Sequence, residues 1–369
     1  MKFLILSSSF GDGHSKAAKA ITSYIEKIDK TAEIKITGPD EYVGPIYDRV
    51  IVNFYFNIIK LTPGLYSSLY KMVDEYDTPK KILGTIHKML SFKLKKTIKE
   101  FDPDFIICTH PFPLQYIASI KKKLPKKTKI IAIITDFHAH NIYLYPEIDM
   151  YIVASRFLKS KFVERGIKEN KISAIGIPVE TSFLKKEDKD IIRKKLNLPN
   201  KTTIMIMGGG FGFGKIKEMV ISLMENKNDL EVLVITGNNK KLKKDLEVLV
   251  NEKQKNNFII YGYSNQIPEL MSVSDFLITK PGGLTLSEAL AKNTTIITYS
   301  PLPGQEEYNS DFLQKFGAAY SLENCLDINS VLDNLINNKD LLEKLKKSAK
   351  KMAPNSNYKK IINEIIKNT

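Results

Sequence analysis

Residues 278–312, ITKPGGLTLSEALAKNTTIITYSPLPGQEEYNSDF, contain the pattern that decides the fold. An apolar run ends at Gly282 and Gly283, a helical pattern follows, and the chain then enters a second apolar run, TTIITYS. Apolar runs without alternating polar residues indicate strands that are buried on both faces, which are parallel strands joined by helices. We therefore expect a doubly wound α/β unit around this stretch.

The same alternation of apolar runs and helical patterns occurs in both halves of the chain. In the first half the runs are KFLILSS (2–8), DFIICTH (104–110), KIIAIITD (129–136), MYIVAS (150–155) and KISAIGIP (171–178). In the second half they are TTIMIMGGG (202–210), EVLVITG (231–237), NNFIIYGY (256–263), DFLITKPGG (275–283) and TTIITYS (294–300). The polar, lysine-rich segment between the halves predicts a linker. We expect domains at 1–178 and 200–350, with a C-terminal helix at about 355–369 that packs back on the first.

Composition narrows the class of protein. The 369 residues are 43% hydrophobic, which suffices for two cores, and the net charge of +15 favours anionic partners such as nucleic acid, anionic lipid or a phosphorylated substrate. The two cysteines, Cys108 and Cys325, do not suggest a disulfide framework. No run of about 20 apolar residues is present, so we expect a cytoplasmic protein whose membrane contact is peripheral.

A glycine-rich loop follows the first strand of the second half. It reads GGGFGFG (208–214), and the candidate anion-binding residues are Gly208, Gly209, Gly210, Phe211 and Gly212. Glycines allow backbone N–H groups and a helix N-terminus to approach a diphosphate closely. The loop is not a Walker A motif, and no acidic residue closes the next strand as in a dinucleotide fingerprint. A tight turn with only a structural role remains the alternative.

The helix start in 278–312 is the second candidate for binding a nucleotide. Lys280, Pro281, Gly282, Gly283 and Thr285 lie where free helix amides would meet a phosphate. Glu288 could accept hydrogen bonds from ribose hydroxyls, or it could be a carboxylate favoured by the helix macrodipole. The following rigid loop supplies Gly304, Gln305 and Glu306 as candidate partners of sugar hydroxyls.

Segment 42–99 departs from the alternating pattern. It contains nine tyrosine and phenylalanine side chains, lysines crowd its second part, and the lysines continue into KKKLPKKTK at 121–129. Aromatic and aliphatic residues interleaved with lysine suit a surface that enters a lipid headgroup layer. An ordinary helical insertion with core aromatics and solvated lysines is the other interpretation.

Five motifs in order resemble the monogalactosyldiacylglycerol synthase and processive diacylglycerol glucosyltransferase family, which is similar to glycosyltransferase family 28. They are SSSFGDGHSKAAKAI (7–21), CTHPFP (108–113), TDFHAHNIYLYPEIDMYIVAS (135–155), TKPGGLTLSEA (279–289) and PLPGQEEYN (301–309). The resemblance covers most of the chain. One departure is Tyr143, where relatives usually carry tryptophan.

The resemblance implies a GT-B fold, in which two Rossmann-like domains face a cleft. It implies that the second domain binds the UDP-sugar through the residues above together with Tyr263, that the anomeric carbon is inverted, and that neither a cofactor nor a metal is obligatory. The Asp-x-Asp at Asp102 to Asp104 precedes a strand and is interpreted as a turn. No metal-binding residue is therefore predicted.

Inverting transfer needs a base for the acceptor hydroxyl. His14 is the first choice, because its turn lies at a strand end and the matching family histidine is implicated in the acceptor site. Asp12 or Asp136 could orient its imidazole or act as the base, and helix capping is the structural alternative for His14. The remaining acceptor-side candidates are Gly11, Gly13, His110, His138 and His140.

Together these inferences predict a peripheral membrane hexosyltransferase. We expect transfer of glucose, or of galactose, from a UDP-sugar to the 3-hydroxyl of 1,2-diacylglycerol at the cytoplasmic face of the cell membrane, with anionic lipids as partners. The alternative within enzymes is a UDP-GlcNAc transferase that acts on a polyprenyl-diphosphate lipid. An epimerase of similar fold is a more distant option. Nucleic-acid binding is suggested by charge alone, because no recognised motif supports it.

Overall fold

The computed structural model describes residues 1–8, 12–38, 41, 62–75, 84–210, 212, 214–354 and 357–367. Contacts within the chain divide it into two compact units. The first comprises Met1–Thr181, Pro303–Gln305 and Pro354–Thr369, and the second comprises Ser182–Leu302 and Glu306–Ala353. Among the described residues, no helix is both long enough and apolar enough to span a membrane.

The first unit is built on a parallel sheet of six strands in the order β2-β1-β3-β4-β5-β6. The strands are β1 (Lys2–Leu6), β2 (Glu33–Thr37), β3 (Phe105–Cys108), β4 (Lys129–Ile133), β5 (Met150–Ile152) and β6 (Ile172–Ser173). The five apolar runs of the first half form β1, β3, β4, β5 and β6, which confirms those predictions. The edge strand β2 was not predicted.

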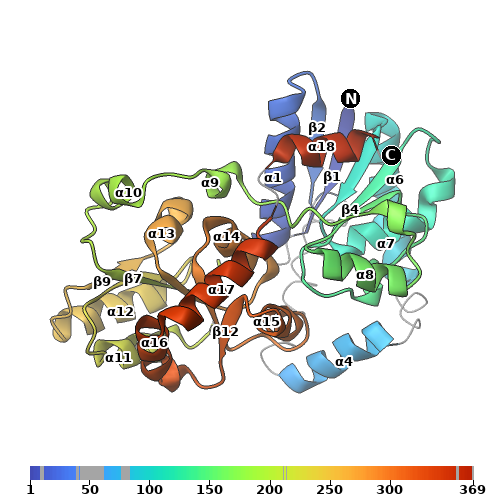
Figure 1. The fold of residues 1–369 in the computed structure, drawn as a ribbon. Helices are drawn as coiled ribbons and strands as arrows, with labels where there is room; N and C mark the ends of the chain where they lie inside the picture. Colours follow the sequence, from blue (N-terminus) through green and yellow to red (C-terminus); the bar gives the residue numbers. More distant parts are fainter. Residues whose placement is uncertain are drawn as a thin grey trace. The chain divides into compact units, whose positions relative to one another are not determined.

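Helices connect the strands of the first unit. They are α1 (Asp12–Ile28), α4 (Pro63–Glu75), α6 (Gly84–Phe101), α7 (Pro111–Ile120), α8 (Arg156–Glu164) and α18 (Tyr358–Lys367), with short helices η1 (Lys121–Lys123), η2 (Asn141–Tyr143) and η3 (Glu169–Lys171). The C-terminal helix α18 packs against α1 (Figure 1). Ile361, Ile362 and Ile365 supply its buried face. The chain therefore ends in the unit in which it begins.

The second unit repeats the design with a parallel sheet in the order β12-β11-β10-β7-β8-β9. Its strands are β7 (Thr202–Met207), β8 (Leu230–Ile235), β9 (Phe258–Tyr261), β10 (Phe276–Thr279), β11 (Thr295–Tyr299) and β12 (Ala319–Leu322). Five of them match the predicted runs, and the edge strand β12 does not. Both sheets confirm the predicted doubly wound α/β class.

The helices of the second unit begin within the predicted linker. They are α10 (Lys189–Lys195), α11 (Ile216–Met224), α12 (Lys240–Glu252), α13 (Ile267–Val273), α14 (Gly283–Lys292), α15 (Gln305–Lys315), α16 (Ile328–Asn337) and α17 (Lys339–Met352), with η4 (Cys325–Asp327); α9 (Thr181–Leu184) lies at the boundary. The buried guanidinium of Arg193 in α10 donates to the carbonyl oxygens of Pro199 and Val273. The second part of the predicted linker is therefore packed structure.

Strand order explains why distant motifs meet within each unit. In the first, β1, β3 and β4 are neighbours, so the segments that follow them lie at one edge of the sheet. In the second, β7, β10 and β11 are neighbours, which gathers the glycine loop, the segment 280–283 and the start of the loop that follows β11. These carboxyl-terminal edges are where open α/β sheets bind ligands.

Candidate functional site

The imidazole of His14 is held by main-chain and side-chain oxygens at the carboxyl edge of the first sheet. Its Nδ1 lies 2.7 Å from the carbonyl oxygen of Thr109 and 3.0 Å from the hydroxyl of Thr135. A carbonyl only accepts hydrogen bonds, so Nδ1 carries the proton and donates it. In the neutral ring the lone pair then belongs to Nε2, which is the form that a general base requires.

The protonation equilibrium of His14 favours that neutral form. Burial lowers the pKa of His14 below its ordinary value of 6.5, while the Asp136 carboxylate and the bond to Thr109 oppose the shift without cancelling it. Edge-on contact with the ring of His110, at 4.5 Å between centroids, fixes one side of the imidazole. His14 is therefore a neutral, oriented imidazole at neutral pH.

Asp136 and His110 are buried beside His14. Asp136 is 2% exposed and its Oδ2 accepts a hydrogen bond of 3.2 Å from the hydroxyl of Tyr143. His110 is the N-cap of α7, since its Nδ1 accepts from the backbone N–H of Phe112. Burial, and then the neighbouring His14, lower the pKa of His110. The neutral His110 is thus tied to its helix.

Two other predicted acceptor-side histidines bond to helix α4. His140 caps η2 by accepting from the N–H of Ile142, and its Nε2 lies 3.0 Å from the carbonyl oxygen of Tyr70. The Nε2 of His138 lies 2.8 Å from Oδ2 of Asp74. His140 is only 1% exposed. A contact between either histidine and a substrate stays a prediction.

Parts of the predicted acceptor side fall outside the described residues. These are Gly11, the side chain of Asp12, and most of the aromatic side chains of segment 42–99. The described helix of that segment with placed aromatic rings is α4, where Tyr66 and Tyr70 lie 6.1 Å apart between ring centroids. Gly13 lies in the first turn of α1, directly before His14.

The glycine loop of the second unit packs against neighbouring backbone. Gly212 has φ +60, and a Cβ there would lie 2.2 Å from the carbonyl oxygen of Thr236. Asn238 donates its N–H to the carbonyl of Gly210 at 2.8 Å, which ties the loop to the end of β8. Phe211 lies outside the described residues. Glycine at 212 is therefore required by both backbone conformation and space.

Helix α14 begins beside this loop with an open N-terminus. Gly282 is its N-cap, no side chain caps it, and a Cβ at Gly282 would meet nothing within 4 Å. The turn before it is fixed from outside, because the amide of Asn309 donates to the carbonyl of Pro281 at 3.1 Å. Thr285 is half-buried in the first turn, and Glu288 is 2% exposed. Free helix amides at this point suit an anion.

Lys280 and Glu306, both predicted to face the donor, form an ion pair of 3.1 Å. Glu306 also accepts the N–H of Leu302 at 2.7 Å, so its carboxylate is held on two sides. Gly304 and Gln305 belong to the stretch Pro303–Gln305, whose contacts group it with the first unit. Tyr263 follows β9, two strands away from β7, and is 61% exposed.

Sequence reasoning missed several residues that hold this arrangement. Thr109 lies in the motif CTHPFP and Thr135 begins the motif at 135–155. Both come just after a strand, and this position could have identified them as partners of His14. Asn309 is likewise the last residue of PLPGQEEYN. Asp74 and Arg165 are 91 residues apart and bond at 2.6 Å, and no local pattern connects them.

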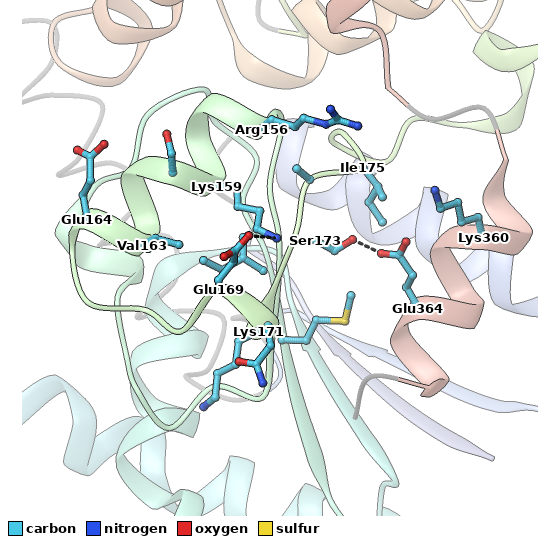
Figure 2. A pocket seen from close by; sticks show the side chains of 15 residues that line it. Arg156, Lys159, Val163, Glu164, Glu169, Lys171, Ser173, Ile175, Lys360 and Glu364 are labelled. Atoms are coloured by element: carbon cyan, nitrogen blue, oxygen red, sulfur yellow. Dashed lines mark hydrogen bonds and ion pairs between the residues drawn. The ribbon is translucent and has the colours of Figure 1, made fainter.

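A cavity of about 750 Å³ lies elsewhere in the first unit, between α8, β6 and α18. Figure 2 shows Lys159 paired with Glu169, and Ser173 bonded to Glu364 of α18. None of the predicted site residues lines this cavity.

Within the described residues, no cluster of three or more histidine, cysteine or acidic side chains could hold a metal ion. The expectation that no metal is needed remains a prediction.

Comparisons with known proteins relate both halves to glycosyltransferases. The family model described as "Monogalactosyldiacylglycerol (MGDG) synthase" matches residues 14–179, and "Glycosyltransferase family 28 C-terminal domain" matches residues 203–365. A processive diacylglycerol beta-glucosyltransferase of Bacillus pumilus is 32% identical over 99% of this chain and 94% of its own length. The protein of the same name from Bacillus licheniformis is 31% identical over 98% of this chain and 94% of its own length.

Solved structures share the fold. MurG of Acinetobacter baumannii has a TM-score of 0.65 at 15% identity over 99% of both chains. The Anabaena protein Alr3699/HepE, solved with UDP and glucose, has a TM-score of 0.57 at 12% identity over 100% of both chains. UDP-GlcNAc 2-epimerase of Neisseria meningitidis, bound to UDP-GlcNAc, has a TM-score of 0.62 at 16% identity over 100% of both chains. The predicted GT-B fold is confirmed.

Proposed function

The chain belongs to the family of the processive diacylglycerol beta-glucosyltransferases, and on that premise we propose that it transfers glucose from UDP-glucose to the 3-hydroxyl of 1,2-diacylglycerol. Relatives that are 31–32% identical over nearly the whole chain are named processive diacylglycerol beta-glucosyltransferases. The fold alone would not select it, because an epimerase shares the fold. The family and the site geometry together support a hexosyltransferase.

Inversion at the anomeric carbon follows from the proposed product. Glucose is α-linked in UDP-glucose, and the relatives are named beta-glucosyltransferases. One displacement converts the first linkage into the second: the acceptor oxygen attacks C1 on the face opposite UDP, and the bond from C1 to the diphosphate oxygen breaks. The acceptor hydroxyl loses its proton in that step, so a base must stand next to it.

The orientation of His14 is the observation that carries the assignment of the base. Its Nδ1 proton is engaged by Thr109, so Nε2 has the lone pair that takes the proton of the glycerol hydroxyl. Asp136 is buried close enough to influence the pKa of His14 and stabilises the imidazolium that forms. We assign His14 as the base and Asp136 as the supporting carboxylate.

UDP is assigned to the second unit. The N-terminal amides of α14 and the amides of the glycine loop stabilise the charge that develops on the diphosphate, with Lys280 as an added cation. Glu288 receives the ribose hydroxyls, and Glu306 faces the sugar. This division leaves the cluster around His14 for the acceptor.

Diacylglycerol exists in a bilayer, so the enzyme works at a membrane surface. The net charge of +15 supports binding to anionic lipid at the cytoplasmic face, and each well-placed lysine adds on the order of 1 kcal/mol. Salt weakens such an attraction, since the interactions are screened beyond about 10 Å. Peripheral binding of this kind needs no spanning helix.

The test is incubation with radiolabelled UDP-glucose or UDP-galactose and anionic vesicles containing diacylglycerol, with lipid products separated by chromatography. Label in a β-glucosyl lipid is the expected result, and bands with further sugars would reveal repeated transfer. A third arm supplies UDP-GlcNAc and a polyprenyl-diphosphate lipid. Label in that arm alone would favour the cell-wall alternative, and absence of label in both diacylglycerol arms would refute the proposal.

A further inference from the structure

We propose that Asp74 is a positioning residue that anchors helix α4 beside the acceptor-side cluster, which comprises His14, His110, Asp136 and His140. This anchorage serves binding of the lipid acceptor. The role in lipid binding rests on the proposed function, whereas the anchorage of α4 rests on geometry alone. The proposal also gives His138 and His140 a defined role as the partners of this helix.

The carboxylate of Asp74 is surrounded by donors from two other segments of the first unit, residues 138–141 and Arg165. Oδ1 lies 2.6 Å from Nη1 of Arg165 and 2.9 Å from the backbone nitrogen of Asn141. Oδ2 lies 2.8 Å from Nε2 of His138 and 3.4 Å from Nη2 of Arg165. The side-chain amide of Asn141 also bonds to the backbone carbonyl of Asp74. The side chain is 9% exposed, so these contacts are largely shielded from water.

This set of bonds stabilises the ionised carboxylate. Burial by itself would raise the pKa of Asp74, but the hydrogen bonds from His138, Arg165 and Asn141 outweigh burial and hold the pKa well below its usual range. A buried carboxylate with several charged or polar donors is costly to disrupt, because each lost partner leaves a desolvated group behind. Asp74 is therefore a strong local constraint on the end of α4.

One turn earlier in α4, Tyr70 contacts His140 of the acceptor-side cluster. Its ring lies 4.2 Å from that of His140 between centroids, and its carbonyl is within 3.0 Å of His140 Nε2. Burial, then the proximity of Asp136 and Tyr143, raise the pKa of the Tyr70 hydroxyl. Tyr143 in turn donates to Asp136. The helix that Asp74 anchors thus carries an aromatic ring next to the carboxylate assigned to support His14.

The position of α4 in the sequence connects this anchorage to lipid. It is the described helix between residues 42 and 83, in the segment whose aromatic and lysine pattern predicts contact with a headgroup layer. Its first turns carry Tyr66, and its last turn carries Asp74. Anchoring this helix at its C-terminal end holds Tyr70 beside His140 and Asp136. We infer that its loss impairs capture of the lipid acceptor more than binding of the nucleotide donor.

The experiment compares Asp74→Asn with Asp149→Asn as a matched control. Asp149 is another partly buried carboxylate of the first unit that accepts from a lysine, Lys121 at 2.5 Å, and from a backbone N–H, that of Ile130 at 2.7 Å. The donors to its carboxylate, Lys121 and Ile130, belong to η1 and β4 and not to α4. Hydrogen–deuterium exchange of the peptide that covers 62–75 is measured first, because it needs no activity. Steady-state kinetics with vesicles then give KM for diacylglycerol and for UDP-glucose separately.

In Asp74→Asn, exchange in α4 should rise about tenfold, and KM for diacylglycerol should rise about tenfold with KM for UDP-glucose unchanged. The Asp149→Asn control should leave exchange in 62–75 and the ratio of the two KM values as in the wild type. Arg165→Gln, which removes a partner from outside α4, should reproduce the effect, and the double variant should show less than the sum of both.

Unchanged exchange in both Asp74→Asn and Arg165→Gln would overturn the anchorage. Faster exchange with unchanged KM for diacylglycerol, or with an equal rise in both KM values, would overturn the acceptor role. A wild-type chain that transfers no sugar to diacylglycerol would refute the proposed function and with it the acceptor role. In that case the exchange measurement still decides the anchorage on its own.

Discussion

Nδ1 of His14 lies 2.7 Å from the carbonyl oxygen of Thr109, and this bond sets which ring nitrogen is free to act as a base. The two residues are distant in sequence but follow adjacent strands, since β1 pairs with β3 through Leu6 and Cys108. Thr109 also donates its N–H to the carbonyl of Leu6, at 3.0 Å. The orientation of the imidazole therefore depends on the register of the sheet.

The rate of transfer should follow the neutral form of His14. Since burial lowers its pKa below 6.5, kcat should fall on the acid side only below about pH 6.5. The Asp136 carboxylate raises the pKa of His14, so Asp136→Asn should move the acid limb to lower pH while also reducing kcat. A pH–rate profile of both proteins tests the direction. An acid limb that moves to higher pH in the variant would contradict the assignment.

Glu288→Gln should weaken binding of the ribose. The buried carboxylate is replaced by an amide of the same shape, and we expect about tenfold weaker binding of UDP, with a smaller loss for 2′-deoxy-UDP. Isothermal titration calorimetry gives both affinities. Glu231→Gln is the control, because Glu231 is a buried carboxylate of the same unit whose pKa burial raises. Equal losses for UDP and 2′-deoxy-UDP would argue against the ribose contact.

Gly212→Ala should distort the glycine loop. The added Cβ would lie 2.2 Å from the carbonyl oxygen of Thr236 at a φ of +60, so the loop must shift at a cost of about 1–3 kcal/mol. We expect lower thermal stability and weaker binding of UDP-glucose. Gly262→Ala serves as control, since its Cβ would be 3.5 Å from a flexible Lys243 carbon. Donor affinity equal to that of the wild type would show that the loop does not bind the donor.

The ionised carboxylate of Asp74 should stabilise the folded chain at pH values above its ordinary pKa, and this contribution should disappear in strong acid. Because its pKa is depressed in the folded chain, its contribution is present above the unfolded value of 3.8 and is lost as pH falls through the folded pKa. The difference in urea midpoint between wild type and Asp74→Asn should shrink when pH falls from about 6 to about 3. A difference that is constant across that range would mean that the charge of Asp74 is not what stabilises the fold.

The sequence predicted the two sheets because central strands are nearly continuous apolar runs. It missed β2 and β12, which lie at sheet edges and have partly exposed side chains, so they lack that pattern. The second part of the predicted linker forms α10. Its residue Arg193 donates a hydrogen bond to the distant carbonyl of Val273, and composition does not reveal such a bond. Local sequence patterns therefore predict edge strands poorly. They also predict poorly those helices whose positions depend on distant contacts.

The sequence could single out candidate residues that lie in the segment after a strand. Asp136 and Gly282 closely follow β4 and β10, and His14 lies in the first turn of the helix after β1, because parallel strands deliver the segments that follow them to one edge. The contact between Asp74 and Arg165 obeys no such rule, since it depends on how α4 packs. The pairing of Lys280 with Glu306 was likewise not predicted, although both residues were singled out.

The role of His14 as the base is tested by measuring transfer of labelled glucose to diacylglycerol by His14→Ala together with its affinity for UDP. Thr109 and Thr135 fix the ring of His14 for proton transfer, and UDP is assigned to the other unit. If His14 is the base, its loss should lower kcat by about 10²–10⁴-fold and leave the affinity for UDP within twofold of wild type. Near-normal turnover in His14→Ala would contradict it.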